Sequence, residues 1–314
     1  MLSMVCGNVL VGDAGVLNMP PRLLGEWQKD KVRALASAIE LARERGAERV
    51  VLAGGLFAEG FVPQSLLEQA MGALAQCGLP VTYLPLVREA LDLEARLAVP
   101  GNIAIERADV SEPLAGLRVI HGGVVAELAV TDAAGTHLHE LPLLEPQGFG
   151  GAGDAGETGF YLVDAEAPTP VSQDAPVPAV ASYVLVPHAL HPFRVLRVSM
   201  DGVETSHEMV EKVTVAIKDV DPAVCLRLEL RGKAPLQAYF NTDKLADLLS
   251  GHFFYAEVAN ECAVDLSMDE LEGDVSLLAE FLRAVAADES LSPTEQSRIM
   301  RCGWNALNGK ELAE

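Results

Sequence analysis

The chain has 314 residues, of which 50% are hydrophobic and 22% are charged, and its formal net charge at pH 7 is −22. This length predicts one large domain or two ordinary ones, and the apolar content excludes disorder as a description of the whole chain. Proteins that bind nucleic acid by neutralising phosphates carry basic surfaces, so the acidic balance argues against direct DNA binding.

The first third of the chain alternates predicted strands and helices. Apolar runs of strand length cover residues 5–11, 49–53 and 80–84. A helix is predicted between the first two runs, because Trp27, Asp30 or Lys31, Val32, Leu35, Ile39 and Ala42 recur at helical spacing before Gly46. A second helix follows Pro63 and ends before Gly78. Uniformly apolar strands alternating with helices predict an α/β domain with a parallel sheet buried on both faces.

The pattern changes after Pro100. Short strands are expected at 102–108 and 117–123, and residues 125–144 are expected to form a hairpin that turns at 133–135. A glycine-rich loop, residues 148–159, leads into an expected strand at 160–164. Residues 166–192, rich in proline and alanine, are expected to link a first domain (1–165) to a second (193–314), with His188 and His191 as surface groups of the linker.

The last third is predicted to be an α+β domain. Strands are expected at 194–200, 224–230 and 253–260, the second with alternating leucines that indicate one buried face. Helices are expected after the capping box of Thr205 and Glu208, at 242–249, and in two terminal segments near 275–287 and 293–307.

The cysteines, the long uncharged segment and the N-terminus indicate where in the cell the protein is expected. Five scattered cysteines without zinc-like spacing predict reduced thiols in a cytoplasmic protein. The uncharged stretch 175–193 contains four prolines, so it cannot cross a membrane as a helix. The N-terminal residues lack a basic region and predict a buried strand, not a signal peptide.

Few motifs carry chemistry. The glycine-rich loop lacks the Gly-Lys-Ser/Thr of a phosphate-binding loop and precedes a strand, so a plain loop is favoured. No serine or cysteine lies in a catalytic signature. His137 and His139 alternate on a predicted strand and share one side of it, which suits either a metal pair or the solvent face of a hairpin.

Several segments resemble the SbcD-type DNA repair exonucleases, especially the YhaO-like branch of these calcineurin-like metallophosphoesterases. Residues 38–60 and 74–89 resemble the two strands that end in Gly-Asp-Leu-Phe-Asp and Gly-Asn-His-Asp in that family. Residues 101–123 resemble its core strands, 156–166 its Glu-Thr-Gly segment, and 224–232 its C-terminal capping domain. The resemblance implies a reduced calcineurin-like layered sheet followed by an α+β cap.

The resemblance also gives the positions of the family's metal ligands, which can be compared one at a time. The opening Asp-x-His falls on Asn8 and Leu10, and the bridging aspartate of Gly-Asp-Leu-Phe falls on Gly55. The asparagine, histidine and acid of Gly-Asn-His-Asp fall on residues 87–89, Val-Arg-Glu. The later Gly-His-x-His corresponds to His137 and His139, and His121 is a candidate for the remaining histidine.

These replacements decide the expected chemistry. Two divalent cations about 3.5–4 Å apart need an anionic bridge, which glycine cannot provide. We therefore expect no catalytic residue, no bound cofactor and a degenerate nuclease homologue. The alternative is an active phosphoesterase or nuclease with a reduced site, in which His121, His137 and His139 hold one divalent metal, Mn or Zn.

The family resemblance implies a partner. We expect an SbcC/YhaN-like, SMC-type ATPase, for which this chain would be a structural or regulatory subunit that meets DNA only indirectly, with no membrane contact and with oligomers possible. The acidic charge favours docking to a basic protein surface. An acidic decoy that occupies a DNA-binding groove remains a third hypothesis.

Overall fold

The structure is a computed structural model. It describes residues 1–13, 19–58, 61–85, 96–106, 127–132, 135–149, 157–165, 180–238, 240–266 and 271–309. The chain divides into two compact units, Met1–Pro192 and Phe193–Glu314, and each is described by itself. No helix in the described ranges is long and apolar enough to cross a membrane.

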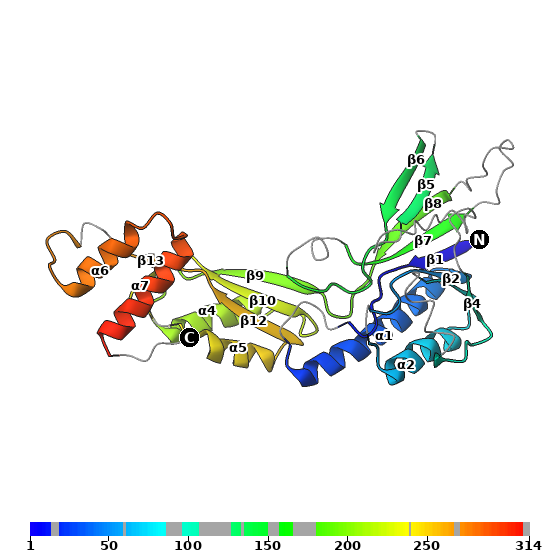
Figure 1. Cartoon of the computed structure of the whole chain (residues 1–314), viewed down its shortest axis with the longest axis horizontal. Helices are drawn as coiled ribbons and strands as arrows, with labels where there is room; N and C mark the ends of the chain where they lie inside the picture. Colours follow the sequence, from blue (N-terminus) through cyan, green and yellow to red (C-terminus); the bar gives the residue numbers. More distant parts are fainter. Residues whose placement is uncertain are drawn as a thin grey trace. The chain divides into compact units, whose positions relative to one another are not determined.

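The first unit is built on a six-stranded mixed sheet (Figure 1). In sheet order its strands are β4 (Ile103–Ile105), β3 (Val81–Leu84), β2 (Arg49–Ala53), β1 (Leu2–Cys6), β7 (Gly159–Ala165) and β8 (Val180–Pro187). Neighbours among β1–β4 are parallel, whereas β7 runs antiparallel to both β1 and β8. The predicted α/β class is confirmed, but the sheet is mixed and not purely parallel.

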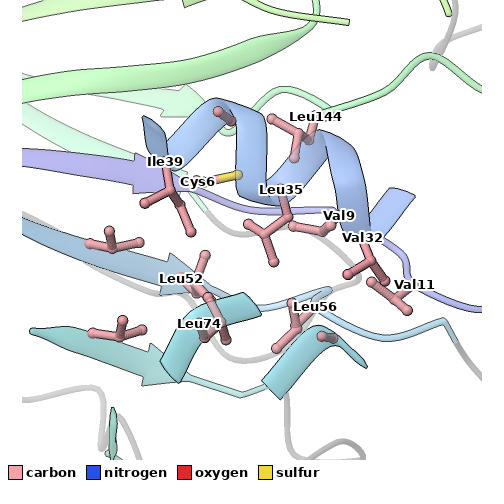
Figure 2. Packing of buried hydrophobic residues seen from close by; sticks show 14 of the residues in the cluster. Cys6, Val9, Val11, Val32, Leu35, Ile39, Leu52, Leu56, Leu74 and Leu144 are labelled. Carbon is pink, nitrogen blue, oxygen red and sulfur yellow. The ribbon is translucent and has the colours of Figure 1, made fainter. Parts of the chain in front are cut away.

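Two helices cover one face of this sheet. Helix α1 (Pro21–Glu44) connects β1 to β2 and α2 (Gln64–Gln76) connects β2 to β3. The two crossovers step the same way along the sheet, so right-handed connections place both helices on one side, as Figure 1 shows. Figure 2 shows the core that results, in which Leu35 and Ile39 of α1 and Leu74 of α2 pack with Leu52 of β2.

Two segments of the first unit differ from the sequence expectations. The apolar run 5–11 is not one strand, because β1 ends at Cys6 and both Asn8 and Leu10 have positive φ angles, 51° and 55°. Residues 180–187, inside the expected linker, form strand β8, which pairs antiparallel with β7 from Gly159–Pro187 to Ala165–Val180, with one register shift at Asp164 and Ala165. Val186 of β8 is fully buried in the first core, which anchors this strand to the sheet.

The expected hairpin is present as β5 (Glu127–Asp132) and β6 (Gly135–Glu140), which pair antiparallel. Its turn at 133–134, the expected strand at 117–123 and most of the glycine-rich loop lie outside the described residues.

The second unit alternates strands and helices. Its three parallel strands lie in the order β12 (Tyr255–Asn260), β10 (Cys225–Arg231) and β9 (Phe193–Ser199). Helix α4 (Ser206–Ile217) connects β9 to β10, and α5 (Thr242–Ser250) connects β10 to β12. The expected α+β organisation is therefore corrected to α/β, because each pair of adjacent parallel strands is joined by a helical crossover.

The faces of this second sheet differ in chemistry. Leu226, Leu228 and Leu230 of β10 are fully buried in a core that includes residues of α4 and α5. On the opposite face of β10, Glu229 accepts hydrogen bonds from Arg197 Nε at 2.9 Å and Arg231 Nε at 3.0 Å. The predicted alternation along this strand is confirmed.

The C-terminal end forms a smaller cluster of helices and strands. Helices α6 (Leu277–Ala286) and α7 (Pro293–Leu307) pack around Leu282 and Met300, next to the parallel pair β11 (Lys233–Pro235) and β13 (Ala263–Asp265). The sequence predicted both helices but neither strand, because three residues are too few to show a period of two.

Candidate functional site

The edge of the first sheet at the carboxyl ends of β1, β2 and β3 is where the family resemblance places metal ligands. Ligand sites of open α/β sheets lie at this edge. Asn8 and Leu10 follow β1 and Gly55 follows β2, so the structure brings these positions together. Residues 87–89 and His121 lie outside the described residues.

Backbone pairing continues past the strands at this edge. Leu10 N donates to Gly55 O at 2.8 Å, and Val11 N donates to Leu56 O at 2.9 Å. The pairing leaves no room for a side chain at position 55: a Cβ there would lie 2.8 Å from Asn8 Oδ1 and 2.9 Å from Asn8 Cα. Asn8 itself is engaged, because its Nδ2 donates to Leu141 O at 3.1 Å. A bridging carboxylate therefore does not fit this backbone.

Apolar side chains fill the adjoining layer. Val9, Val11, Leu56 and Leu144 are buried in the first core, and Figure 2 shows them beside residues of α1. Hydrocarbon lacks the oxygen, nitrogen or sulfur atoms that bind divalent cations. The described part of this edge thus has the chemistry of a packed core.

The histidine candidates are only partly placed. His137 and His139 lie on β6, opposite Val130 and Leu128 of β5, and their side chains are outside what the structure describes. Within the described ranges, no three or more His, Cys, Asp or Glu side chains are grouped so as to hold a metal ion. The three-histidine arrangement remains a prediction.

A buried polar cluster lies beside the same edge, next to β7 and β8. The register pairs Gly159 with Pro187, so the residues that follow β8 lie next to the start of β7. The cluster comprises Asp30 and Lys31 of α1, Glu145 of the segment before β7, and His188 and His191 after β8. We call it the Lys31–Glu145 cluster.

Hydrogen bonds connect most of the cluster. Glu145 accepts hydrogen bonds from two backbone amides, Leu190 N at 2.5 Å and His191 N at 3.2 Å. His191 Nε2 lies 3.0 Å from Asp30 Oδ2, and His188 Nε2 lies 3.2 Å from Ser37 Oγ. Three chain segments are therefore joined by polar contacts.

Lys31 is the most unusual member. Its side chain is 1% exposed, its Nζ has no hydrogen-bond partner among the described residues, and that atom lies 5.1 Å from the centre of the Trp27 ring. Burial lowers the pKa of Lys31 to about 8, although the charges of Asp13 and Glu145 act in the opposite direction. An ammonium without hydrogen bonds is costly to bury, which is the cause of the shift.

Two neighbours also have shifted pKa values. Burial raises the pKa of Glu145, while its two backbone hydrogen bonds and the charges of His191 and Lys31 lower it by less. Burial lowers the pKa of His188. In each case desolvation of the charged form is the largest cause.

The positions of His188 and His191 correct a sequence expectation. They were expected on the surface, but their side chains are 8% and 12% exposed. They are buried because β8 places them between α1 and the segment before β7. The helical repeat already put position 30 or 31 on the buried face of α1, whereas nothing in the sequence marked Glu145.

The fold and the site together define an α/β protein with a closed, apolar strand edge and a buried charged cluster beside it. No protein-family model matches the chain, and no curated protein matches it at a significant level. A function therefore has to be proposed from the motifs and the geometry.

Proposed function

We propose that the chain is a catalytically degenerate SbcD/YhaO-like protein, which serves as a structural or regulatory subunit beside an SbcC/YhaN-like, SMC-type ATPase. The observation that supports this proposal is the close approach of Asn8 to Gly55 at the strand edge. The proposed relatives need ligands at these positions.

The chemistry follows from this approach. In a two-metal phosphoesterase, one cation activates the attacking water and the other stabilises the leaving oxygen, and a carboxylate holds the pair together. With Gly55 and Asn8 in contact and Val9 and Val11 buried beneath, the described edge offers neither the bridge nor space for it. Phosphodiester hydrolysis at this edge is not part of the proposed function.

The charge and the cysteines support the rest of the proposal. A net charge of −22 favours a basic protein partner over direct contact with DNA. All five cysteines are free thiols, which suits the proposed cytoplasmic location. Oligomers of the chain are compatible with this role.

Two measurements on the purified protein and one coexpression experiment test the proposal. We expect no stoichiometric metal by elemental analysis, no cleavage of DNA with added Mn²⁺, and a stable complex when the chain is coexpressed with an SMC-type ATPase of the SbcC/YhaN kind. Failure to form this complex would remove the partner from the proposal.

Bound metal together with cleavage would overturn the degenerate role. The three-histidine hypothesis then predicts that His137→Ala removes both metal and activity. The matched control is His207→Ala, because His207 lies on α4 with a side chain that is 83% exposed and pairs only weakly with Glu211.

A further inference from the structure

The segment that joins the two units is short and follows directly from the first sheet. Strand β8 ends at Pro187 and β9 begins at Phe193, with the boundary between the units after Pro192. We call residues 188–192 the connector. How firmly the connector is held to the first unit limits the freedom of the second.

One carboxylate makes two of the hydrogen bonds that hold the connector. Both oxygens of Glu145 are used: Oε1 accepts from Leu190 N at 2.5 Å and Oε2 accepts from His191 N at 3.2 Å. The side chain is only 3% exposed. Hydrogen bonds to an ionised acceptor are stronger than neutral ones, and burial strengthens them further.

Further contacts hold the connector to the first unit. His191 pairs with Asp30 and His188 with Ser37, both on α1. The backbone of His188 also exchanges contacts with Thr158, whose O accepts from His188 N at 3.1 Å. Leu190 packs against the first core. Among the described residues, Glu145 is the one side chain that accepts hydrogen bonds from two consecutive amides of the connector.

Two backbone hydrogen bonds, and after them the nearby charges, favour the ionised form of the buried Glu145. Lys31 is a buried cation that attracts it, His191 also favours its charged form, and His188 Nδ1 lies 3.9 Å from its Oε1. Asp30 is paired with Arg33 and His191, and Asp13 acts on Lys31. The two backbone amides are therefore the main groups that favour the ionised form of Glu145, and the charges of His191 and Lys31 add to them.

We propose that Glu145 is a latch, which fixes the connector to the first unit and thereby restricts the positions that the second unit can take. Removal of the latch frees the connector without unfolding either unit. The proposal does not depend on the proposed function, because it concerns the isolated chain.

Hydrogen exchange on the full chain tests the latch. In Glu145→Ala, exchange of the amides of residues 190 and 191 should become faster by about tenfold or more, because two charge-assisted hydrogen bonds are lost. In Glu145→Gln, which keeps one carbonyl acceptor, the increase should be smaller. Exchange in β2 should be unchanged in both variants, which separates opening of the latch from global unfolding.

A matched control is Glu140→Ala, which removes an exposed carboxylate of β6 five residues earlier in the chain. It should leave exchange in the connector unchanged. The latch would be overturned if residues 190 and 191 exchanged equally fast in wild type and in Glu145→Ala. It would also be overturned if Glu140→Ala accelerated their exchange as much as Glu145→Ala does.

A second measurement tests how Glu145 affects the range of distances between the two units. Spin labels at the exposed positions Gln69 and Asp247, with Cys77 and Cys302 replaced by serine, report the distribution of distances between the units. Glu145→Ala should broaden this distribution relative to the Glu140→Ala control. An unchanged width would show that Glu145 does not restrict the second unit and would overturn the proposal.

Discussion

At the scale of single residues, Lys31 predicts an unusual dependence of stability on pH. Its pKa is about 8 in the folded chain against the ordinary 10.5, so between these values the unfolded chain binds a proton that the folded chain does not. The free energy of unfolding therefore rises with pH across this window, by roughly 3 kcal/mol in total. Below pH 8 the full cost of burying the ammonium is present.

Replacement of this side chain tests the prediction. Lys31→Met keeps the aliphatic stem and removes the charge, so at pH 7 we expect it to raise the free energy of unfolding by about 1–3 kcal/mol and to remove the rise toward pH 10. Urea unfolding at pH 7, 8.5 and 10 measures both effects. Lys29→Met, on the exposed side of the same helix, should behave like wild type.

Gly55 predicts a steric effect. A Cβ at this position would meet the side chain and the backbone of Asn8, and the φ angle of 58° is unfavourable for other residues. We expect Gly55→Ala to lower the free energy of unfolding by roughly 2–4 kcal/mol. Gly46→Ala is the control, since Gly46 also has a positive φ but open space around it. A loss no larger than that of Gly46→Ala, about 1 kcal/mol, would contradict the close approach.

At the scale of elements, the contact between α6 and α7 depends on a glycine. A Cβ at Gly303 of α7 would overlap the ring of Phe281 on α6. Gly303→Ala should therefore destabilise the second unit by about 1–3 kcal/mol, despite the better helix propensity of alanine. Gly72→Ala in α2 meets no atom within 4 Å and should stabilise the first unit by about 0.5–1 kcal/mol. Thermal unfolding of both variants compares the two; stabilisation by Gly303→Ala would refute the tight helix contact.

Elements with a strong local period were predictable from the sequence. The helices around Leu35 and Leu74 and the alternating strand at Leu226–Leu230 were predicted because each contributes a regular apolar face. Strand β8 was missed, since it directly follows residues 166–179, whose prolines and alanines resemble a linker, and its pairing with β7 could not be seen in the sequence. The end of β1 was also missed, because the apolar run continues past the turn at Asn8.

The candidate site was less predictable than the fold. Asn8 and Gly55 could be singled out from their positions after apolar strands, but their contact depends on the tertiary structure. Glu145, His188 and His191 come together only through the register of β7 and β8, and no short motif marks them. Buried polar groups that pair across distant segments leave no period in the sequence.

At the scale of the whole molecule, each unit has its own apolar core. We therefore predict that residues 193–314 fold by themselves, with a cooperative urea transition and dispersed amide resonances. In this segment, Leu228→Ala should lower the free energy of unfolding by about 2–5 kcal/mol, because Leu228 is fully buried. A poorly dispersed spectrum for the isolated segment would show that the second core needs the first unit.

The contact between Asn8 and Gly55 also constrains how this sequence can evolve. A carboxylate at position 55 requires the backbone after β1 to move away, yet the backbone conformation at Asn8 and Leu10 is what pairs the two segments. Substitution of either position alone passes through a less stable protein, so several changes would have to occur together. A metal-binding sequence at this strand edge therefore cannot be reached by single substitutions without loss of stability. Selection against the less stable intermediates would keep the present residues in place.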